Sequence, residues 1–351
     1  MKSPIFTGFW GKCHIQGIAV DKKNGYIYYS FTTRLVKATL EGDIIGSVEG
    51  LVGHLGCIAF NENDGCVYGS LEYKNDAIGK GILNSIGSSE SLSDGFYLVR
   101  FKAWEIDRIG INAENSNIMS AVYLKEVTDD YNGIGYDKNG KAVAHKYGCS
   151  GIDGVTFAPL PSRNENEGMY LYVAYGIYAD INRNDNNYQI LLCYDIAELE
   201  RFFEKLDQKN MHKKGPAKPY QKYFVYTGNT CYGVQNLEYD SFTKSIFMAV
   251  YKGKKTEFPN YSLFAVNTEC PFEEKFSEEL NEKIKCLTLK KQGLYDEKSG
   301  IYGWDFPYGA TGLYSFGDGN WLICHEDSTS EGQCGYIYHY KWNETQPFEK
   351  V

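Results

Sequence analysis

The sequence predicts an all-β fold, a five-bladed β-propeller closed by its N-terminal strand. Three observations carry this prediction: a phrase that recurs five times, a further strand-like run after each copy, and an apolar N-terminal segment that has no other place in the pattern. Six blades are the alternative, because degenerate copies of a repeat can escape notice. Residues 1–351 are expected to form a single propeller domain.

Each copy of the phrase has an apolar run, a polar turn with Asp, Asn or Gly, and a second run rich in Tyr and β-branched residues. This order is typical of two antiparallel strands joined by a turn. Repetition of such a unit along a chain is typical of propeller blades. The copies occupy residues 17–31, 57–71, 154–176, 236–253 and 312–326, of which the last is degenerate.

Further strands complete the predicted blades. A third strand is expected at 32–40, 95–103, 188–196, 261–268 and 335–342. A fourth strand is expected at 44–50, 119–127, 222–228 and 284–291. The fifth unit ends before its fourth strand, so residues 4–10 (PIFTGFW) are expected to replace it, which would remove an exposed sheet edge. Two charged segments, 197–214 and 271–283, are predicted to be short helical insertions at the rim.

The composition narrows the partners that the protein can have. The 30 Tyr and 19 Phe favour strands, and the 37 Gly suit a chain with many turns. The net charge of −9 is spread along the chain, which argues against nucleic acid and is compatible with a sugar, a cationic ligand or a metal. No apolar run is long enough to predict a membrane span. The expected partner is therefore a small molecule or carbohydrate, and neither nucleic acid nor a membrane.

The cysteines predict a reducing environment. The ten Cys are irregularly spaced and form no CxxC pair, so a zinc site of the usual spacing is not expected. Several lie in apolar runs, where a free thiol behaves as a small hydrophobic side chain. The N-terminal sequence MKSPIFTGFWGK has no apolar signal-peptide run. These features predict a cytoplasmic protein, or a secreted one if a signal peptide has been removed.

The register of the first strand in each unit points to a site. Two positions before the first apolar residue, the copies have polar or small residues: Gln16, Gly56, Asp153, Gln235 and Thr311. Four positions before it, they have His14, His54, Gly151, Gly233 and Gly309. Strands alternate faces, and the first strands of a propeller line its central channel. The polar residues are therefore expected to ring one end of the channel, with the histidines above them.

The second strands end at the same end of the channel. Their ends and the loops that follow bring in Glu72, Tyr73, Tyr175, Lys252, His325, Glu326 and Asp327. Three of the loops, 72–94, 176–187 and 252–260, are long, and long loops on one face of a rigid scaffold commonly carry function. The DINRNDN run at 180–186 alternates oxygen donors but lacks the Gly and Glu of an EF-hand loop, so it is interpreted as a turn.

Three roles are assigned to these residues. Asp153, Glu72 and Glu326 are the candidate catalytic acids and bases. The candidate substrate-binding residues are Gln16, Gln235, Asn236, Tyr73, Tyr175 and Tyr178, with Trp10 as a further stacking face. His14, His54 and Asp153 could together bind one zinc- or manganese-like ion. The alternatives are that the polar residues only hydrogen-bond their neighbours and that the histidines are ordinary turn residues.

The phrase GIAVDKKNGYIYYSF at 17–31 resembles the blade repeat of the NHL, YWTD and SMP-30 (gluconolactonase-like) propellers. The shared features are an apolar strand, an Asp, an Asn-Gly turn and a Tyr-rich strand. The gluconolactonase-like group holds a divalent metal at the channel mouth with Glu, Asn and Asp, for which Glu72, Asn236 and Asp153 are the nearest matches. The chain also resembles five-bladed glycosidases, but it has Gln16 where they place an Asp base, which weakens that interpretation.

Two functions are consistent with these observations. The first is a hydrolase or lyase that acts on a sugar or sugar-derived substrate at the channel mouth, with or without one divalent metal ion. The second is a propeller without catalytic activity that binds a small molecule or a protein at the same face. Propellers serve both purposes, so the fold does not decide between them.

Overall fold

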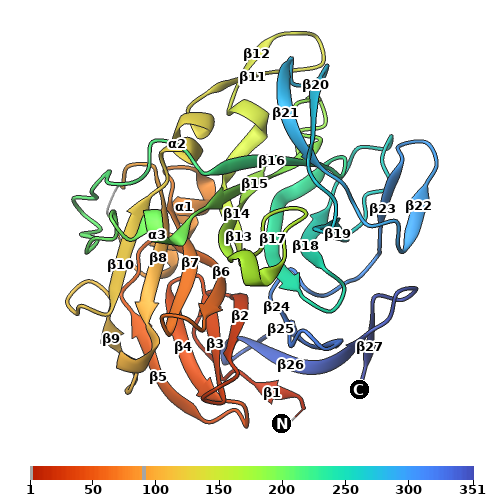
Figure 1. The fold of residues 1–351 in the computed structure, drawn as a ribbon. Helices are drawn as coiled ribbons and strands as arrows, with labels where there is room; N and C mark the ends of the chain where they lie inside the picture. The colour runs from red at the N-terminus through yellow and green to blue at the C-terminus, as the bar shows by residue number, and fades with distance from the viewer. Residues whose placement is uncertain (1–2, 89–91) are drawn as a thin grey trace.

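The computed structural model describes residues 3–88 and 92–351 as a β-propeller of five blades. The blades surround a central axis, and their first strands, β2, β6, β13, β17 and β24, lie innermost (Figure 1). This confirms the predicted fold class and number of blades.

The first two blades are four-stranded antiparallel sheets. Blade I contains β2 (Ile15–Asp21), β3 (Tyr26–Phe31), β4 (Arg34–Thr39) and β5 (Ile44–Glu49), and its outer edge is extended by the parallel strand β9 (Ile111–Asn112). Blade II contains β6 (His54–Asn61), β7 (Cys66–Tyr73), β8 (Gly95–Lys102) and β10 (Met119–Tyr123).

The next two blades differ in width. Blade III contains β13 (Cys149–Ala158), β14 (Tyr170–Ile177), β15 (Tyr188–Tyr194), β16 (Gln221–Tyr226), β21 (Glu282–Leu287) and β20 (Glu273–Ser277). Blade IV contains β17 (Thr230–Asp240), β18 (Ser245–Lys252) and β19 (Leu263–Asn267). The predicted strand at 284–291 is divided between blades III and IV. Its first part lies in β21, which pairs in parallel with β16, whereas Thr288 and Lys290 hydrogen-bond to β19 at 2.8 Å each.

Blade V joins the two ends of the chain (Figure 1). It contains β24 (Leu313–Ser315), β25 (Asn320–Thr329), β26 (Gly332–Trp342), β27 (Phe348–Lys350) and the N-terminal strand β1 (Ile5–Phe6). In the pairing of β1 with β26, Ile5 lies opposite Ile337. Beyond the strand, the Thr7 amide donates to the Gly335 carbonyl at 3.0 Å and the Gly335 amide donates to the Thr7 hydroxyl at 2.8 Å. The predicted closure of the ring is confirmed.

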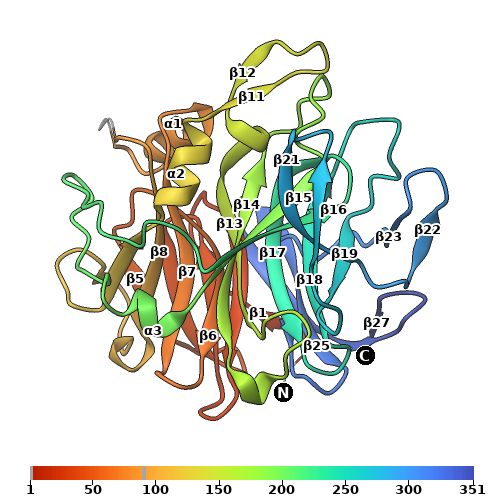
Figure 2. The ribbon, with the colours of Figure 1, turned by 45° about the horizontal axis from the view of Figure 1, so that its top comes forward.

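Of the three α-helices among the described residues, only α3 (Ile196–Leu199) overlaps a predicted helical insertion. The structure has α1 (Ala77–Ser85), α2 (Lys125–Tyr131) and the four-residue α3, with small hairpins β11 (Ile134–Tyr136)–β12 (Ala142–Ala144) and β22 (Leu294–Asp296)–β23 (Ile301–Gly303). Both α1 and α2 project from one end of the propeller together with the β11–β12 hairpin (Figure 2). None of the described helices is long and apolar enough to cross a membrane.

The predicted helix at 271–283 is wrong, and the one at 197–214 is confirmed only at its start, both for a tertiary reason. Residues 271–283 contain strand β20 and the start of β21, because the open edge of β16 offers backbone hydrogen bonds that a solvated helix would not use. In 197–214 the helix stops after α3. The chain then runs across the outside of the molecule, burying Leu206 in the core of blades I and II and hydrogen-bonding Gln208 to the Gly50 carbonyl at 2.8 Å.

A β-bulge recurs in the first strands at one register. The pairing with the second strand is interrupted between Ile15 and Gly17 in β2, and the corresponding interruption occurs in the next three blades. There it falls between Leu55 and Ile58, between Ile152 and Val155, and between Val234 and Asn236. The residues inside the bulges include Gln16, Gly56, Asp153 and Gln235, the polar or small residues that the sequence aligned. A bulge re-aims the side chain that it carries, so these residues leave the regular alternation of the strand.

Closure by β1 predicts a specific loss of stability. Ile5 is fully buried between blades V and I, so Ile5→Ala should lower the free energy of unfolding by about 2–5 kcal/mol, and deletion of residues 1–11 should lower it further. Urea denaturation measures both changes. Ile109→Ala is the matched control, because Ile109 is 62% exposed, and its effect should stay within about 0.5 kcal/mol. Equal stability of the wild-type protein and the deletion variant would contradict closure by this strand.

Candidate functional site

A cavity of about 290 Å³ lies at the end of the channel where the first strands begin and the second strands end. Blades I to IV contribute its walls, and α1 contributes Ile78. Its polar lining includes Gln16, His54, Glu72, Lys74, Asp153 and Gln235. Helices α1 and α2 and the β11–β12 hairpin project from this same end (Figure 2). The register analysis therefore located a real concavity, although the roles of its residues stay predictions.

Glu72 is the most heavily engaged group in the cavity. It lies at the end of β7, directly opposite His54 in β6. Its Oε1 is 2.5 Å from Lys74 Nζ and 3.5 Å from His54 Nδ1, and its Oε2 accepts a hydrogen bond from the Ile152 amide at 3.0 Å. A Cβ atom on Gly151 would lie 1.9 Å from Glu72 Oε2, so only glycine allows blades II and III to approach in this way.

Lys74 and Glu72 form a buried ion pair. Burial alone would raise the pKa of the Glu72 carboxyl, but the Lys74 ammonium and His54 together outweigh it and the pKa is lowered. In the same way, burial opposes the charge of Lys74, yet Glu72 raises the pKa of this ammonium. Lys74 also donates to the Ser150 carbonyl at 2.8 Å, which ties the end of β7 to blade III. Both groups are therefore ionised at neutral pH.

Asp153 is buried without such a partner. Its side chain lies in the bulge of β13 and accepts one hydrogen bond, from the Cys57 amide to Oδ1 at 3.3 Å. A Cβ atom on Gly56 would lie 2.1 Å from this oxygen, so the glycine of blade II makes room for the carboxyl. Burial raises the pKa of Asp153 to about 7, with a smaller contribution from the Glu72 charge. Asp153 can therefore gain or lose a proton near neutral pH.

His54 adds a second group that can exchange a proton. Burial lowers the pKa of its imidazole, but Glu72 and Asp153 together outweigh burial and raise it. Its Nδ1 is buried without a well-aligned hydrogen bond to any described residue, despite lying 3.5 Å from Glu72. The cavity thus combines one fixed ion pair with two groups, Asp153 and His54, whose protonation can change.

The amide side chains have different positions. Gln16 donates to the Thr32 hydroxyl at 3.1 Å and Gln235 donates to the Tyr232 carbonyl at 3.0 Å, and both line the cavity. Asn236 instead donates to the Gln16 and Ala310 carbonyls at 2.8 and 2.7 Å. Its amide group joins blade IV to blades I and V, and it is not among the residues that line the cavity.

Several predicted residues lie away from the cavity. Tyr73 and Tyr175 are buried in the core, where their hydroxyls donate to Gln208 Oε1 at 3.0 Å and Asp130 Oδ2 at 2.7 Å, so a ligand in the cavity cannot reach them. Tyr178 donates to Asp76 Oδ2 at 3.1 Å, beside the start of α1. Trp10 donates to the Thr7 carbonyl at 2.7 Å and packs near Phe31 in blade I.

Other residues of the cavity were not predicted. Lys74 follows Glu72 by two positions at the end of a strand, and this period of two was the available signal that both side chains share a face. Tyr232, Tyr251 and Ile78 also line the cavity. No sequence pattern indicated them, because their positions depend on how blade IV and α1 approach the axis.

The three predicted metal ligands, His14, His54 and Asp153, all line the cavity. The His14 side chain is 56% exposed, and its Nδ1 lies 3.8 Å from Glu326 Oε2. Within residues 3–88 and 92–351, no three His, Cys, Asp or Glu side chains form a group that could hold a metal ion. The Lys74 ammonium, in addition, already supplies the positive charge beside Glu72.

Comparison with known proteins found only distantly similar structures. Neither a protein-family model nor a curated protein matches the chain. A GH43 β-1,3-galactosidase solved with galactodeoxynojirimycin is 8% identical, over 99% of this chain and 97% of that chain, with a TM-score of 0.44. The holo PQQ domain of pyranose dehydrogenase from Coprinopsis cinerea is 12% identical, over 92% and 81%, with a TM-score of 0.35. A functionally unknown protein from Desulfotomaculum acetoxidans is 9% identical, over 96% and 68%, with a TM-score of 0.36.

The burial of Asp153 predicts a pH-dependent gain of stability on its replacement. Its pKa is 3.8 ordinarily and about 7 in the folded protein, so folding takes up a proton between these values and the free energy of unfolding falls as pH rises through them. Asp153→Asn removes this loss and should raise the free energy of unfolding at pH 8 by roughly 1–4 kcal/mol, with a smaller gain near pH 4. Urea denaturation at the two pH values measures it.

Asp43→Asn is the control for this prediction, because Asp43 is exposed in the turn between β4 and β5. The control should match the wild-type protein at both pH values. An Asp153→Asn variant that is less stable than the wild-type protein at pH 8 would show that the Asp153 carboxylate is stabilised by its surroundings.

A divalent metal ion at the channel mouth stays a prediction from the sequence. If imidazoles hold it, one equivalent of ion should accompany protein purified without chelator or affinity-tag metal, and should be lost below about pH 6 as His becomes protonated. Elemental analysis at the two pH values measures this. Protein free of bound ions would contradict the prediction and leave His14 and His54 as hydrogen-bonding residues.

Proposed function

We propose that the protein is a hydrolase of a small sugar-derived substrate, with the cyclic ester of a sugar acid as the best-suited class. The observation that carries the proposal is Asp153, a buried carboxyl in the cavity that has one long hydrogen bond of 3.3 Å and no ion pair within the described residues. A general acid or base works best when its pKa lies near the working pH, and Asp153 meets this condition.

The two carboxyl groups of the cavity suit different tasks. Asp153 changes protonation near neutral pH, whereas Glu72 stays ionised beside Lys74. Carboxyls whose pKa values are driven apart by their environments are typical of acid–base sites. Glu72 receives the Lys74 ammonium and the Ile152 amide and has His54 nearby, so it is poorly suited as a nucleophile or second base. This disfavours the two-carboxylate mechanism of glycosidases.

A single proton-shuttling group is sufficient for ester hydrolysis. The ionised Asp153 carboxylate accepts a proton from water as the water oxygen bonds to the ester carbonyl carbon. When the carbon–oxygen bond of the ring ester breaks, the same carboxyl returns the proton to the leaving oxygen. The net reaction adds one water to the ester and gives an acid and an alcohol, and Asp153 ends as it began. His54, whose charge depends on Asp153, is placed to stabilise the negative charge on the attacked oxygen.

The size and lining of the cavity indicate a small, neutral, hydroxyl-rich substrate. Its volume of about 290 Å³ lies at the low end of the range for small-molecule sites, which suits one sugar ring better than a polysaccharide chain. Gln16 and Gln235 offer amide groups to hydroxyls, and Tyr232 and Tyr251 offer ring faces. The charge of Lys74 is already neutralised by Glu72.

Hydrolysis of a panel of sugar lactones and aryl glycosides, followed by proton release and chromophore release, tests the proposal. We expect turnover of a lactone with an apparent pKa near 7 in kcat/KM, and Asp153→Asn should lower kcat/KM by roughly 10²–10⁴-fold. Asp43→Asn should leave it unchanged. Saturable binding of the sugars without turnover would instead support the non-catalytic alternative, and an Asp153→Asn variant with full activity would contradict the assignment.

A further inference from the structure

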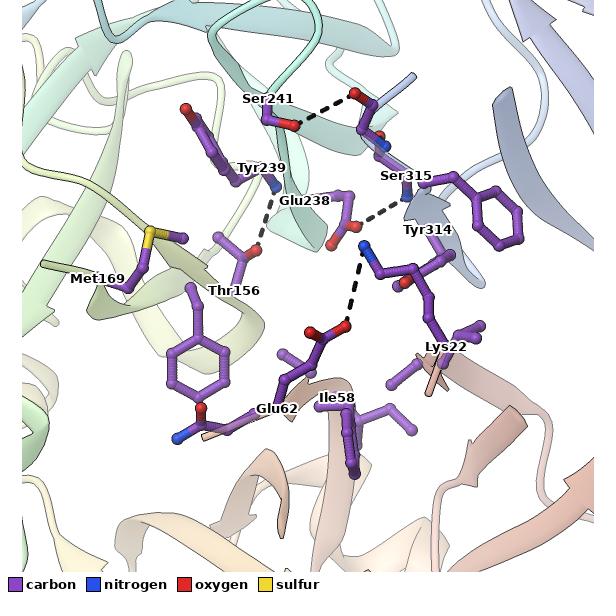
Figure 3. A pocket seen from close by; sticks show the side chains of 18 of the residues that line it. Lys22, Ile58, Glu62, Thr156, Met169, Glu238, Tyr239, Ser241, Tyr314 and Ser315 are labelled. Atoms are coloured by element: carbon purple, nitrogen blue, oxygen red, sulfur yellow. Dashed lines mark hydrogen bonds and ion pairs between the residues drawn. The ribbon is translucent and has the colours of Figure 1, made fainter. Parts of the chain in front are cut away.

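A second cavity, of about 350 Å³, lies at the opposite end of the channel. All five blades contribute to it through the later parts of their first strands and the turns that follow (Figure 3). It shares no lining residue with the cavity that holds Asp153. The proposed function leaves this second cavity without a role.

Glu238 of β17 is the central polar group of this cavity. Its side chain points into the cavity (Figure 3), and its Oε1 accepts a hydrogen bond from the Ser315 amide at 2.8 Å. The neighbouring Thr156 hydroxyl accepts from the Tyr239 amide at 3.1 Å, and its own proton is directed to Glu238, where this hydrogen bond partly offsets the effect of burial on the pKa of the carboxyl. Within the described residues Glu238 forms no ion pair, so its charge lacks a counter-ion when it is ionised.

The surrounding wall combines negative charge with aromatic rings. Two further carboxylates line it, each beside one lysine: Glu62 is 3.8 Å from Lys22, and Glu165 is 2.8 Å from Lys244. The aromatic lining residues are Phe60, Phe157, Tyr239, Tyr314 and Phe316. Lys22, Glu62 and Glu238 point toward one another across the cavity (Figure 3), and Lys22 is the one cation among the lining residues that the structure describes.

We propose that this second cavity binds a small organic cation, a primary ammonium or guanidinium group on an apolar body, with Glu238 as its counter-ion. Glu238 is half-buried and forms no ion pair within the described residues, so a cation in the cavity would supply the counter-ion that its carboxylate lacks. Aromatic rings attract a cation at their faces and also cover its apolar body. A divalent metal fits less well, because no three metal-ligating side chains among the described residues are grouped there.

Titration calorimetry with matched five-carbon probes tests this inference. Pentylamine and pentylguanidine should bind saturably, while pentanol, which has the same body without the charge, should bind about tenfold more weakly or worse, and pentanoate should not bind. A lysine-containing tripeptide distinguishes the source of the ammonium group. Binding of the tripeptide as tightly as pentylamine identifies a protein side chain as the ligand, and weaker binding identifies a free amine.

Three variants locate the site. Glu238→Gln should weaken pentylamine binding about tenfold or more, because the amide keeps the shape and removes the charge. Lys22→Gln should strengthen binding a few-fold, since it removes the competing ammonium. Asp153→Asn should leave pentylamine binding unchanged, which separates this inference from the proposed hydrolase activity. The gain expected from Lys22→Gln keeps the test decisive if Glu238→Gln does not fold.

The pH dependence provides an independent readout. Burial raises the pKa of Glu238 to about 8, so a cation must displace its proton and affinity should increase as pH rises through this value. The other charged and titratable groups around it are Lys22 on blade I, Glu62 on blade II, Glu165 on blade III, Tyr239 and Asp240 on its own strand and Tyr314 on blade V. Equal binding of pentanol and pentylamine, or full affinity in a folded Glu238→Gln variant, would overturn the inference.

Discussion

The pairing of β1 with β26 is the contact on which the rest of the molecule depends. A few residues at the N-terminus complete the outer edge of the last blade, and the C-terminal β27 pairs with the same strand further along. This closure holds the last blade against the first, and so helps to keep the five first strands around a common axis. In this contact, Ile5 is buried, and Thr7 and Gly335 form two hydrogen bonds with each other. The channel cavities therefore depend on a contact that lies outside them.

The carboxyl groups at the two ends of the channel differ in whether they have a positive partner. Glu72 is matched by an ammonium and a backbone amide, and the absence of a side chain on Gly151 permits that contact. Asp153 and Glu238 receive one backbone hydrogen bond each. A carboxylate in the second situation lowers the stability of the fold when it ionises. Such positions are expected where a ligand supplies the missing partner or where a proton must move, and one occurs at each end of the channel.

The repeat and its register were readable from the sequence because they are local properties. Apolar alternation and turn residues predicted the five units, and the alignment of polar positions predicted that Gln16, Asp153 and Gln235 share one cavity. The errors came where local pattern and tertiary context disagreed. The charged segment 271–283 became a strand pair at an open sheet edge, and Tyr73 and Tyr175, which look like surface aromatics at strand ends, have their hydroxyls bonded inside the core.

The amino-acid sequence is enough to predict the five blades and the column of polar positions, because both follow from local repeats, and it also predicts the closing strand, because the last unit lacks a fourth strand. The pKa of each carboxyl follows instead from the tertiary structure, because that pKa depends on neighbouring groups from other blades. Glu72 and Glu238 are both strand glutamates in the sequence, yet Glu72 forms an ion pair with Lys74 and accepts from the Ile152 amide, whereas Glu238 has hydrogen bonds and no ion pair within the described residues. Only the packing of the blades around the axis brings those partners within reach or keeps them away.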